Sequence, residues 1–348
     1  MAIPVVSVVL PVRNGERFVE AAIGSIMRER EPSREMIVVD DGSSDGTPAI
    51  LAGLRRKDSR IVIASQPATG IVAALERGRR YARAPLVARL DADDIAYPGR
   101  LAAQVAAFEA DPDLVLLGTA LDRIGEAGGR PRGAITYPTE HERIVEILPQ
   151  ANVFSHSSVM MRRKAVEAAG GYRSFFTGAE DYDLWLRLAE QGKVGNLAAR
   201  LGAYRVHEDS VSARSALRQA FSAALARRCA VIRREGGPDP SMAREEPIDL
   251  DAEIPPHEPL AAEIRLFRAL AFAEPETFTR RRPTDDDLRL LTAPSLAHAE
   301  RQLAQAAIAN MARLGARPSS LSYPAAIAAV VRLDALRAFR LLFGRAAG

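Results

Sequence analysis

Three carboxylates within four residues, Asp91, Asp93 and Asp94, follow an apolar run at residues 85–90. The run is typical of a short buried strand, so the acids come where that strand leaves its sheet. Side chains alternate along an extended chain, which predicts that Asp91 and Asp93 point one way and Asp94 the other. Acids packed together are costly, because like charges raise each other's pKa and each carboxylate loses water.

A hard divalent cation would remove the cost of this acid cluster. Mg²⁺ or Mn²⁺ bound by one or two carboxylates commonly completes its shell with substrate phosphates. The alternative is that the acids cap the helix that follows, since Pro98 suits the first turn of a helix. The position of the acids after an alternation of strands and helices favours the metal–phosphate site.

That alternation runs through residues 1–90. Strands are expected at residues 5–10, 36–39, 61–64 and 85–90. The first helix is predicted by apolar residues at i, i+3, i+4 and i+7, namely Val19, Ala22, Ile23 and Ile26. Thr47 and Pro48 are typical of an N-cap and a first-turn proline, and residues 71–82 favour another helix. The alternation predicts a parallel sheet with ligands bound beyond the carboxyl ends of its strands.

A second pair of acids, Asp40 and Asp41, also falls at the end of a predicted strand. A carboxylate in this position can accept a hydrogen bond from a base N–H or a ribose hydroxyl of a nucleotide. Alternatively the two acids fix the turn, where Asp and Gly are common. The residues alone leave both interpretations open.

The whole chain divides into three predicted regions, 1–213, 214–260 and 261–348. After residue 102 the first region becomes mixed. The second begins with a helix rich in Ala and Arg and continues as a linker with Pro, Gly and acids. The third has a helical pattern throughout.

Charge and composition exclude several classes of protein. The net charge of the 348 residues is +3, so nothing demands a nucleic-acid partner. The single cysteine, Cys229, rules out an intrachain disulfide and favours a cytoplasmic protein. The apolar start at residues 3–10 is short for a signal peptide, and no uncharged apolar stretch reaches the roughly 18 residues of a membrane span.

Four segments together resemble glycosyltransferase family 2, whose members have the GT-A fold. They are residues 5–15 (VVSVVLPVRNG), 37–47 (IVVDDGSSDGT), 90–94 (LDADD) and 178–188 (GAEDYDLWLRL). The resemblance covers roughly residues 4 to 212. It implies an α/β, Rossmann-like catalytic domain over 1–213, with a mostly parallel sheet flanked by helices and a C-terminal helical extension. It also implies sugar transfer from a nucleotide-diphosphate sugar, usually with inversion at the anomeric carbon.

The resemblance further implies roles for individual residues. Asp40 would bind the nucleotide base, Asp91 and Asp93 match a D-x-D motif that holds ribose and metal, and His207 would lie near the metal or diphosphate. The full set expected to bind the donor nucleotide is Pro11, Val12, Asn14, Glu16, Asp40, Asp41, Asp91 and Ala92. Asp93 and His207 are the expected ligands of Mn²⁺ or Mg²⁺, although a lone histidine is also commonly structural.

The same resemblance places the general base in the pair Glu180-Asp181, with Asp181 as the base. The competing interpretation is a capping box from Thr177 to Glu180, because acids are favoured in the first turn of a helix. Both can hold together if Glu180 caps the helix and Asp181 faces the cleft. Glu180 and His156 are expected to line the acceptor or donor-sugar site.

Two positions depart from the family pattern. Val12 stands where relatives often have an aromatic residue, and Glu76 where they often have asparagine. The first leaves the nucleotide open, with a UDP-sugar expected first and GDP- or dTDP-sugars as alternatives. Residues 325–345 form a basic amphipathic pattern, which predicts either peripheral contact with an anionic membrane or packing on the catalytic domain.

These observations predict a metal-assisted inverting glycosyltransferase, a hexosyltransferase by type. Its acceptor would be a saccharide or lipid-linked, in surface polysaccharide or glycolipid synthesis, either in the cytoplasm or at the inner face of the membrane. A non-catalytic nucleotide-sugar-binding scaffold is one alternative. The other is a sugar nucleotidyltransferase, although the first strand lacks the glycine-rich, lysine-containing phosphate loop that such enzymes use.

Overall fold

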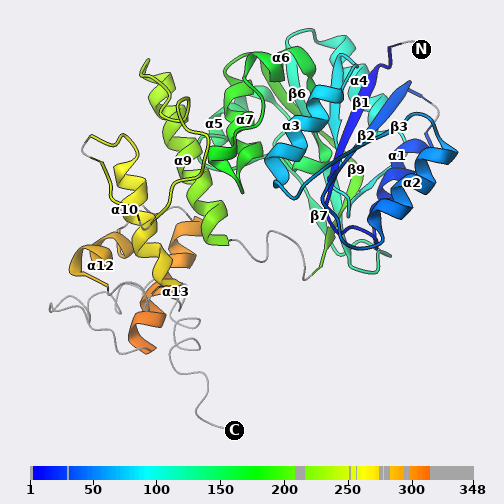
Figure 1. Cartoon of the computed structure of the whole chain (residues 1–348). Helices are drawn as coiled ribbons and strands as arrows, with labels where there is room; N and C mark the ends of the chain where they lie inside the picture. The colour runs from blue at the N-terminus through cyan, green and yellow to red at the C-terminus, as the bar shows by residue number, and fades with distance from the viewer. Residues whose placement is uncertain are drawn as a thin grey trace. The chain divides into compact units, whose positions relative to one another are not determined.

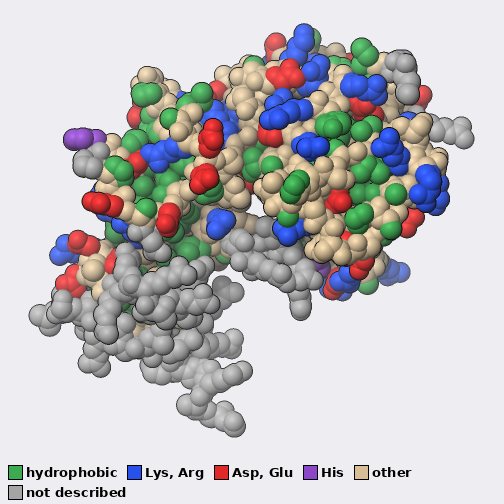
Figure 2. Space-filling model, in the orientation of Figure 1, with side chains coloured by type: hydrophobic (Ala, Val, Ile, Leu, Met, Phe, Trp, Pro, Cys, Tyr) green, Lys and Arg blue, Asp and Glu red, His purple; other side chains and the backbone are tan. Residues whose placement is uncertain are grey.

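The computed structural model describes residues 3–29, 31–207, 216–250, 252–255, 257–273, 277, 283–293, 296 and 298–313 (Figure 1). The chain falls into two compact units, Met1–Arg214 and Ser215–Gly348. The domain boundaries expected from the sequence stay predictions. Basic and acidic side chains of the first unit are interspersed on the face drawn in Figure 2.

The first unit alternates strands and helices along its N-terminal half. Its elements up to the acid cluster are β1 (Val6–Val12), α1 (Val19–Met27), β2 (Arg34–Asp41), α2 (Thr47–Lys57), β3 (Ile61–Gln66), α3 (Ile71–Tyr81) and β4 (Leu86–Arg89). The later elements are β5 (Ile95–Ala96), α4 (Arg100–Ala110), β6 (Leu114–Gly125), β7 (Ala134–Ile135), α5 (His141–Ile147), η1 (His156–Ser158), β8 (Met160–Arg162), α6 (Arg163–Ala168), η2 (Ser174–Phe176), α7 (Glu180–Ala189) and β9 (Lys193–Val206). The predicted strands and helices are all present, most with slightly different bounds.

All the described strands belong to one sheet, in the order β3-β2-β1-β4-β8-β6-β9-β5, with β7 paired to β6. The first four are parallel, β8 runs antiparallel to β4 and β6, and β9 runs parallel to β6. Val12 is in register with Asp40, so β1 and β2 end at the same edge. The predicted parallel arrangement is confirmed for the part of the sheet that carries the pair Asp40 and Asp41 and the acid cluster at residues 91–94.

The continuous apolar sequence of β1 is explained by burial on both faces of the sheet. Val8 and Leu10 pack in a cluster with residues of α1, α2 and α4. Val9 belongs to a second cluster that includes Ala74 of α3. Gly78 of α3 allows a close approach, since a Cβ added there would lie 2.4 Å from Val9 Cγ1.

The start of α2 differs from its prediction. The helix begins at Thr47, with Gly46 as the N-cap residue and Pro48 in the first turn. Thr47 was therefore wrongly predicted as the cap. Its hydroxyl instead accepts a hydrogen bond from Gly15 N at 2.8 Å, while Asp45 Oδ1 accepts one from Thr47 N. The Thr47 hydroxyl therefore binds the loop after β1 and does not cap the helix.

The regular elements described in the second unit are all helices, and residues 235–250, 252–255 and 257–260 between two of them are turns and irregular chain. The unit contains α9 (Ala216–Arg234), α10 (Ala261–Leu270), η3 (Ala271–Ala273), α12 (Asp285–Leu291) and α13 (His298–Arg313). Phe221 and Phe267 pack with ring centroids 5.1 Å apart, and an ion pair of 2.9 Å joins Arg227 to Glu300. Within the described residues, no helix is both long enough and apolar enough to cross a membrane. The basic segment 325–345 lies outside the described residues.

Candidate active site

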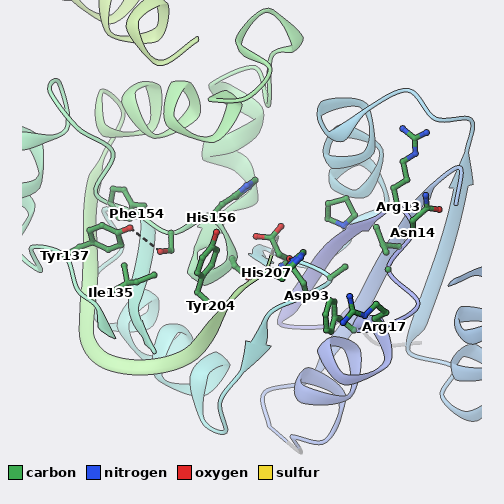
Figure 3. A pocket seen from close by; sticks show the side chains of 18 residues that line it. Arg13, Asn14, Arg17, Asp93, Ile135, Tyr137, Phe154, His156, Tyr204 and His207 are labelled. Carbon is green, nitrogen blue, oxygen red and sulfur yellow. Dashed lines mark hydrogen bonds and ion pairs between the residues drawn. The ribbon is translucent and has the colours of Figure 1, made fainter. Parts of the chain in front are cut away.

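A cavity of about 590 Å³ lies beyond the carboxyl ends of β1 and β4 (Figure 3). Eight of the predicted site residues line it: Pro11, Val12, Asn14, Asp91, Ala92, Asp93, His156 and His207. Glu16, Asp40, Asp41, Glu180 and Asp181 are not among its lining residues. The edge of the sheet therefore gathers most of the predicted donor-site and metal-site residues around one space.

Asn14 and Glu16 tie the loop after β1 to the loop after β2. Asn14 adopts a left-handed backbone with φ of 53°, which asparagine tolerates better than most residues. Its Oδ1 accepts a hydrogen bond from Ser44 N at 2.8 Å. Glu16 Oε2 accepts one from Gly46 N at 2.6 Å. These bonds fix the wall of the cavity next to β1.

The two acids at the end of β2 have different surroundings, although both are buried. Asp41 accepts hydrogen bonds from the backbone N–H groups of Thr69 and Gly70, both at 2.9 Å, and from the Gln66 side chain. These contacts are those of a residue that fixes a turn, here the entry to α3. Within the described residues, Asp40 accepts one side-chain hydrogen bond, from Ser43 N.

The acid cluster lies in a turn, because β4 ends at Arg89. Asp91 Oδ1 accepts a hydrogen bond from Arg89 Nη2 at 2.6 Å, and Asp91 N donates to Ser157 Oγ at 2.9 Å. Asp94 is turned away from the cavity and buried, and its Oδ1 accepts a hydrogen bond from Arg205 N at 2.8 Å. Asp91 and Asp93 thus share one side of the turn, and Asp94 takes the other.

Asp93 and His207 form a pair inside the cavity, with Asp93 Oδ2 2.8 Å from His207 Nε2. Arg205 supports both residues, because its Nε donates to Asp93 O at 2.7 Å and its guanidinium stacks on Phe18. The Phe18 ring in turn lies 5.5 Å from that of His207.

Asp93 and His207 suit a metal cation that is shared with a substrate better than a cation that is enclosed by protein ligands alone. In the described part of the chain, no group of three or more His, Cys, Asp or Glu side chains could hold a metal. One carboxylate and one imidazole converge here, which leaves most of an octahedral shell to other ligands. Phosphate oxygens and water commonly fill such positions on Mg²⁺ and Mn²⁺.

The two acids at the start of α7 lie outside the lining of this cavity, with Glu180 buried and Asp181 half-buried. Burial, with the charge of Asp181 adding to it, raises the pKa of Glu180 to about 7. Burial also raises the pKa of Asp181 to about 6, and the charge of Asp91 contributes to this shift. Asp181 Oδ2 lies 3.4 Å from Asn152 Nδ2. A carboxylate with a raised pKa is a stronger proton acceptor once it is ionised.

The predicted capping box at the start of α7 is wrong. The helix begins at Glu180 with Ala179 as its N-cap residue, and no side-chain hydrogen bond caps it. Thr177 Oγ1 donates to Ser174 O, and Glu180 Oε2 accepts from Gly178 N at 2.6 Å. The carboxylate of Glu180 is therefore held by the preceding loop.

His156 lies in the 3₁₀ turn η1 and lines the cavity. Its Nε2 is 3.0 Å from the hydroxyl of Tyr172, and its ring meets Trp185 edge-on. Burial, together with the positive charge of Arg89, lowers the pKa of His156 well below its ordinary value. The imidazole is therefore neutral near pH 7.

Sequence comparison identifies the family. The model of the family described as "Glycosyl transferase family 2" matches residues 7–170. EpsE of Bacillus subtilis, which is described as a glycosyltransferase, is 35% identical over 212 residues, covering 60% of this chain and 74% of that protein. This chain belongs to glycosyltransferase family 2. The O-antigen biosynthesis glycosyltransferase WbnJ of Escherichia coli is 30% identical over 209 residues, covering 59% of this glycosyltransferase and 81% of WbnJ.

Solved structures show that this glycosyltransferase has the GT-A fold expected from its sequence. S. aureus TarS in complex with UDP-GlcNAc matches with a TM-score of 0.56 at 15% identity, over 89% of this chain and 92% of that one. The mannosyltransferase PcManGT from Pyrobaculum calidifontis, in complex with GDP-Man and Mn²⁺, gives 0.50 at 19% identity, over 99% and 89%. The relatives favour the glycosyltransferase over the scaffold and the nucleotidyltransferase that the sequence left open.

Several residues that line the cavity of the glycosyltransferase were not predicted as site residues. Arg13 and Arg17 lie on the same side of the cavity as Asn14, whereas Ile135, Tyr137, Phe154 and Tyr204 lie on the other (Figure 3). Phe18 also lines the cavity. Arg13 could have been found from its place beside Asn14 within the first matching segment. Tyr137 and Phe154 lie in loops that have no distinctive pattern, whereas Tyr204 belongs to the long strand β9.

The departure at Glu76 has a structural explanation. Glu76 Oε1 accepts hydrogen bonds from Tyr172 N at 2.8 Å and from Arg79 Nε at 3.0 Å. The carboxylate therefore joins α3 to the loop that carries Tyr172, the hydrogen-bond partner of His156. Glu76 does not line the cavity of the glycosyltransferase.

Proposed function

We propose that this glycosyltransferase moves a sugar from a nucleotide-diphosphate sugar to a hydroxyl of a saccharide or lipid-linked acceptor, with inversion at the anomeric carbon. The observation that carries the proposal is the pairing of Asp93 with His207 in the cavity that Asp91 and Arg13 also line. Such a set offers oxygen and nitrogen ligands for a divalent cation and a cationic side chain for a diphosphate.

The donor is positioned by residues near β1 and β4 in this proposal. Asp91 accepts from ribose hydroxyls, and Asp93 and His207 hold Mn²⁺ or Mg²⁺ against the diphosphate. When bound, the cation offsets the negative charge that develops on the leaving nucleoside diphosphate. The guanidinium of Arg13, which lies at the cavity wall, is available to the diphosphate oxygens.

Asp181 acts as the general base. It takes the proton of the acceptor hydroxyl, whose oxygen forms a bond to the anomeric carbon from the face opposite the diphosphate. The bond from that carbon to the diphosphate oxygen breaks, and the nucleoside diphosphate leaves with the electron pair. One displacement inverts the configuration. A base whose pKa is about 6 is ionised at neutral pH and still accepts a proton effectively.

Relatives support the class of donor and the type of product. TarS was solved with UDP-GlcNAc and PcManGT with GDP-Man and Mn²⁺. WbnJ is named for O-antigen biosynthesis, and AmsE of Erwinia amylovora, 29% identical over 212 residues, for amylovoran biosynthesis. We infer a role in polysaccharide or glycolipid assembly, with a UDP-sugar as the first donor to test. The cytoplasmic location and the membrane contact through residues 325–345 stay predictions.

Product analysis tests this proposal. The protein is incubated with UDP-, GDP- and dTDP-hexoses, Mn²⁺ and saccharide acceptors, and released nucleoside diphosphate and pyrophosphate are measured separately. Wild type and Glu109→Gln, a change at an exposed acid of α4, should release nucleoside diphosphate, and Asp181→Asn should not. Release of pyrophosphate, or full activity of Asp181→Asn, would contradict the proposal.

A further inference from the structure

Arg89 is the last residue of β4 and is only 2% exposed. Burying a guanidinium is costly unless good partners compensate for the lost water. Its Nη2 donates to Asp91 Oδ1 at 2.6 Å, and its Nη1 donates to Leu90 O. Its Nε is buried with no hydrogen-bond partner among the described residues. A buried arginine with an unmet donor is poorly explained by stability alone.

Two other buried arginines of the first unit have a different set of partners. Arg187 pairs with the buried carboxylate of Asp183 and donates to backbone carbonyls. Arg100 donates to Gln104 Oε1 and to backbone carbonyls. Asp183 and Gln104 do not line the cavity, whereas Asp91 does. Of these three arginines, Arg89 is the one that contacts a side chain of the candidate active site.

Asp91 is held at two points and exposed at a third. Arg89 binds its Oδ1, and Ser157 Oγ binds its backbone N–H. Its Oδ2 has no hydrogen-bond partner in the described part of the chain, and its side chain is 36% exposed in the cavity wall. The guanidinium therefore occupies one oxygen and leaves the other available to a ligand.

We propose that Arg89 is a positioning residue for the donor nucleotide, which holds one oxygen of Asp91 so that the other meets a hydroxyl group of the bound ribose. The inference rests on the proposed function, in which this cavity binds a nucleoside diphosphate. Arg89 itself does not line the cavity, so it acts through Asp91. The planar guanidinium fixes the angle of the carboxylate, and a lysine ammonium would supply the charge without that geometry.

Calorimetric titration of the full-length protein with UDP and Mn²⁺ tests this role. If GDP, dTDP or CDP binds wild type more tightly, that nucleotide replaces UDP. Arg89→Gln should weaken binding by about tenfold or more, because a charge-assisted hydrogen bond is lost. Arg89→Lys should weaken nucleotide binding less than Arg89→Gln does. Arg187→Met is the matched control, since it breaks another buried ion pair: it should lower the melting temperature and leave the dissociation constant unchanged.

A double-mutant cycle with Asp91→Asn separates positioning from general damage. If Arg89 acts through Asp91, Arg89→Gln should change the dissociation constant by less than about twofold in the Asp91→Asn background. Additive losses would overturn the inference, as would wild-type affinity in Arg89→Gln. Should Arg89→Gln fail to fold, Arg89→Lys in both backgrounds gives the same comparison, with the same criteria. If wild type binds none of the four nucleotides, the proposed function is overturned as well. If wild type binds a nucleotide and Arg89→Gln binds it equally tightly, only the inference about Arg89 is overturned.

Discussion

His207 Nε2 lies 2.8 Å from Asp93 Oδ2, although the two residues are 114 positions apart in the sequence. A very short pairing brings them together. Strand β5, directly after the acid turn, pairs with β9, so that Ile95 faces Ala203. Gly202 permits this approach, because a Cβ added there would lie 2.8 Å from Ile95 O. The end of β9 is thereby carried to the acid cluster, and with it the imidazole.

His207→Ala should weaken the Mn²⁺-dependent binding of a nucleoside diphosphate. The affinity is expected to fall roughly 10- to 100-fold, because mutation of residues that merely hydrogen-bond to metal ligands already has an effect of that size. His141→Ala is the matched control, because His141 Nδ1 accepts a hydrogen bond from Val194 N and does not line the cavity. Titration calorimetry with and without Mn²⁺ measures both variants. Equal affinities for the two variants would argue against a role for His207 at the metal.

Activity should rise with pH as Asp181 ionises. Its pKa of about 6 in the folded protein predicts that kcat/KM increases through about pH 6 and then levels off. Asp181→Asn should reduce kcat by about 10²- to 10⁴-fold, the usual contribution of a positioned base. Initial rates between pH 5 and 8 test this, with Glu109→Gln as the control. A flat profile in wild type would remove Asp181 from the proposed mechanism.

The same carboxylate should have the opposite effect on stability. The pKa of Asp181 is raised from 3.8 to about 6 by folding, so its contribution to stability is full below pH 3.8 and is lost as the pH rises through 6. Asp181→Asn should therefore match wild type in melting temperature at low pH and equal or exceed it at pH 7.5. A lower melting temperature of the variant at pH 7.5 would show that the charge is better stabilised than its burial suggests.

Two helical glycines should respond in opposite ways to alanine. At Gly78 an added Cβ would lie 2.4 Å from Val9 Cγ1 and 3.3 Å from Val39 Cγ2, so Gly78→Ala should destabilise the protein by about 1–3 kcal/mol. At Gly53 of α2 the nearest atom is 3.8 Å away, so Gly53→Ala should stabilise by about 0.5–1 kcal/mol. Thermal unfolding measures the two shifts. An unchanged or raised melting temperature for Gly78→Ala would contradict the packing of α3 on β1.

The parts of the fold that repeat along the chain could be predicted from the sequence. Strand β1 is a continuous apolar run because both its faces are buried, and α1 repeats its apolar residues because one face packs on the sheet. The same alternation located the acid cluster at the end of β4. Burial leaves a local pattern in each case, and local patterns are visible in one sequence.

Features set by distant contacts could not be predicted in this way. The hydroxyls of Thr47 and Thr177 suit helix caps, but Gly15 N binds the first and Ser174 O the second. Strand β5 has two residues, too few for any periodicity. The contact of Arg89 with Asp91 depends on where β4 stops, which the sequence places only approximately.

Nucleotide binding by wild type and Asp93→Ala tests the central claim most directly. Melting temperatures are measured with UDP, GDP, dTDP and CDP, each with and without Mn²⁺. A ligand at 100 times its dissociation constant adds about 2.7 kcal/mol to the stability of the state that binds it. We expect one nucleotide to raise the melting temperature of wild type only when Mn²⁺ is present, and to have no such effect on Asp93→Ala. No shift with any nucleotide at millimolar concentration, or a shift that Asp93→Ala retains in full, would contradict a metal–diphosphate site at Asp93.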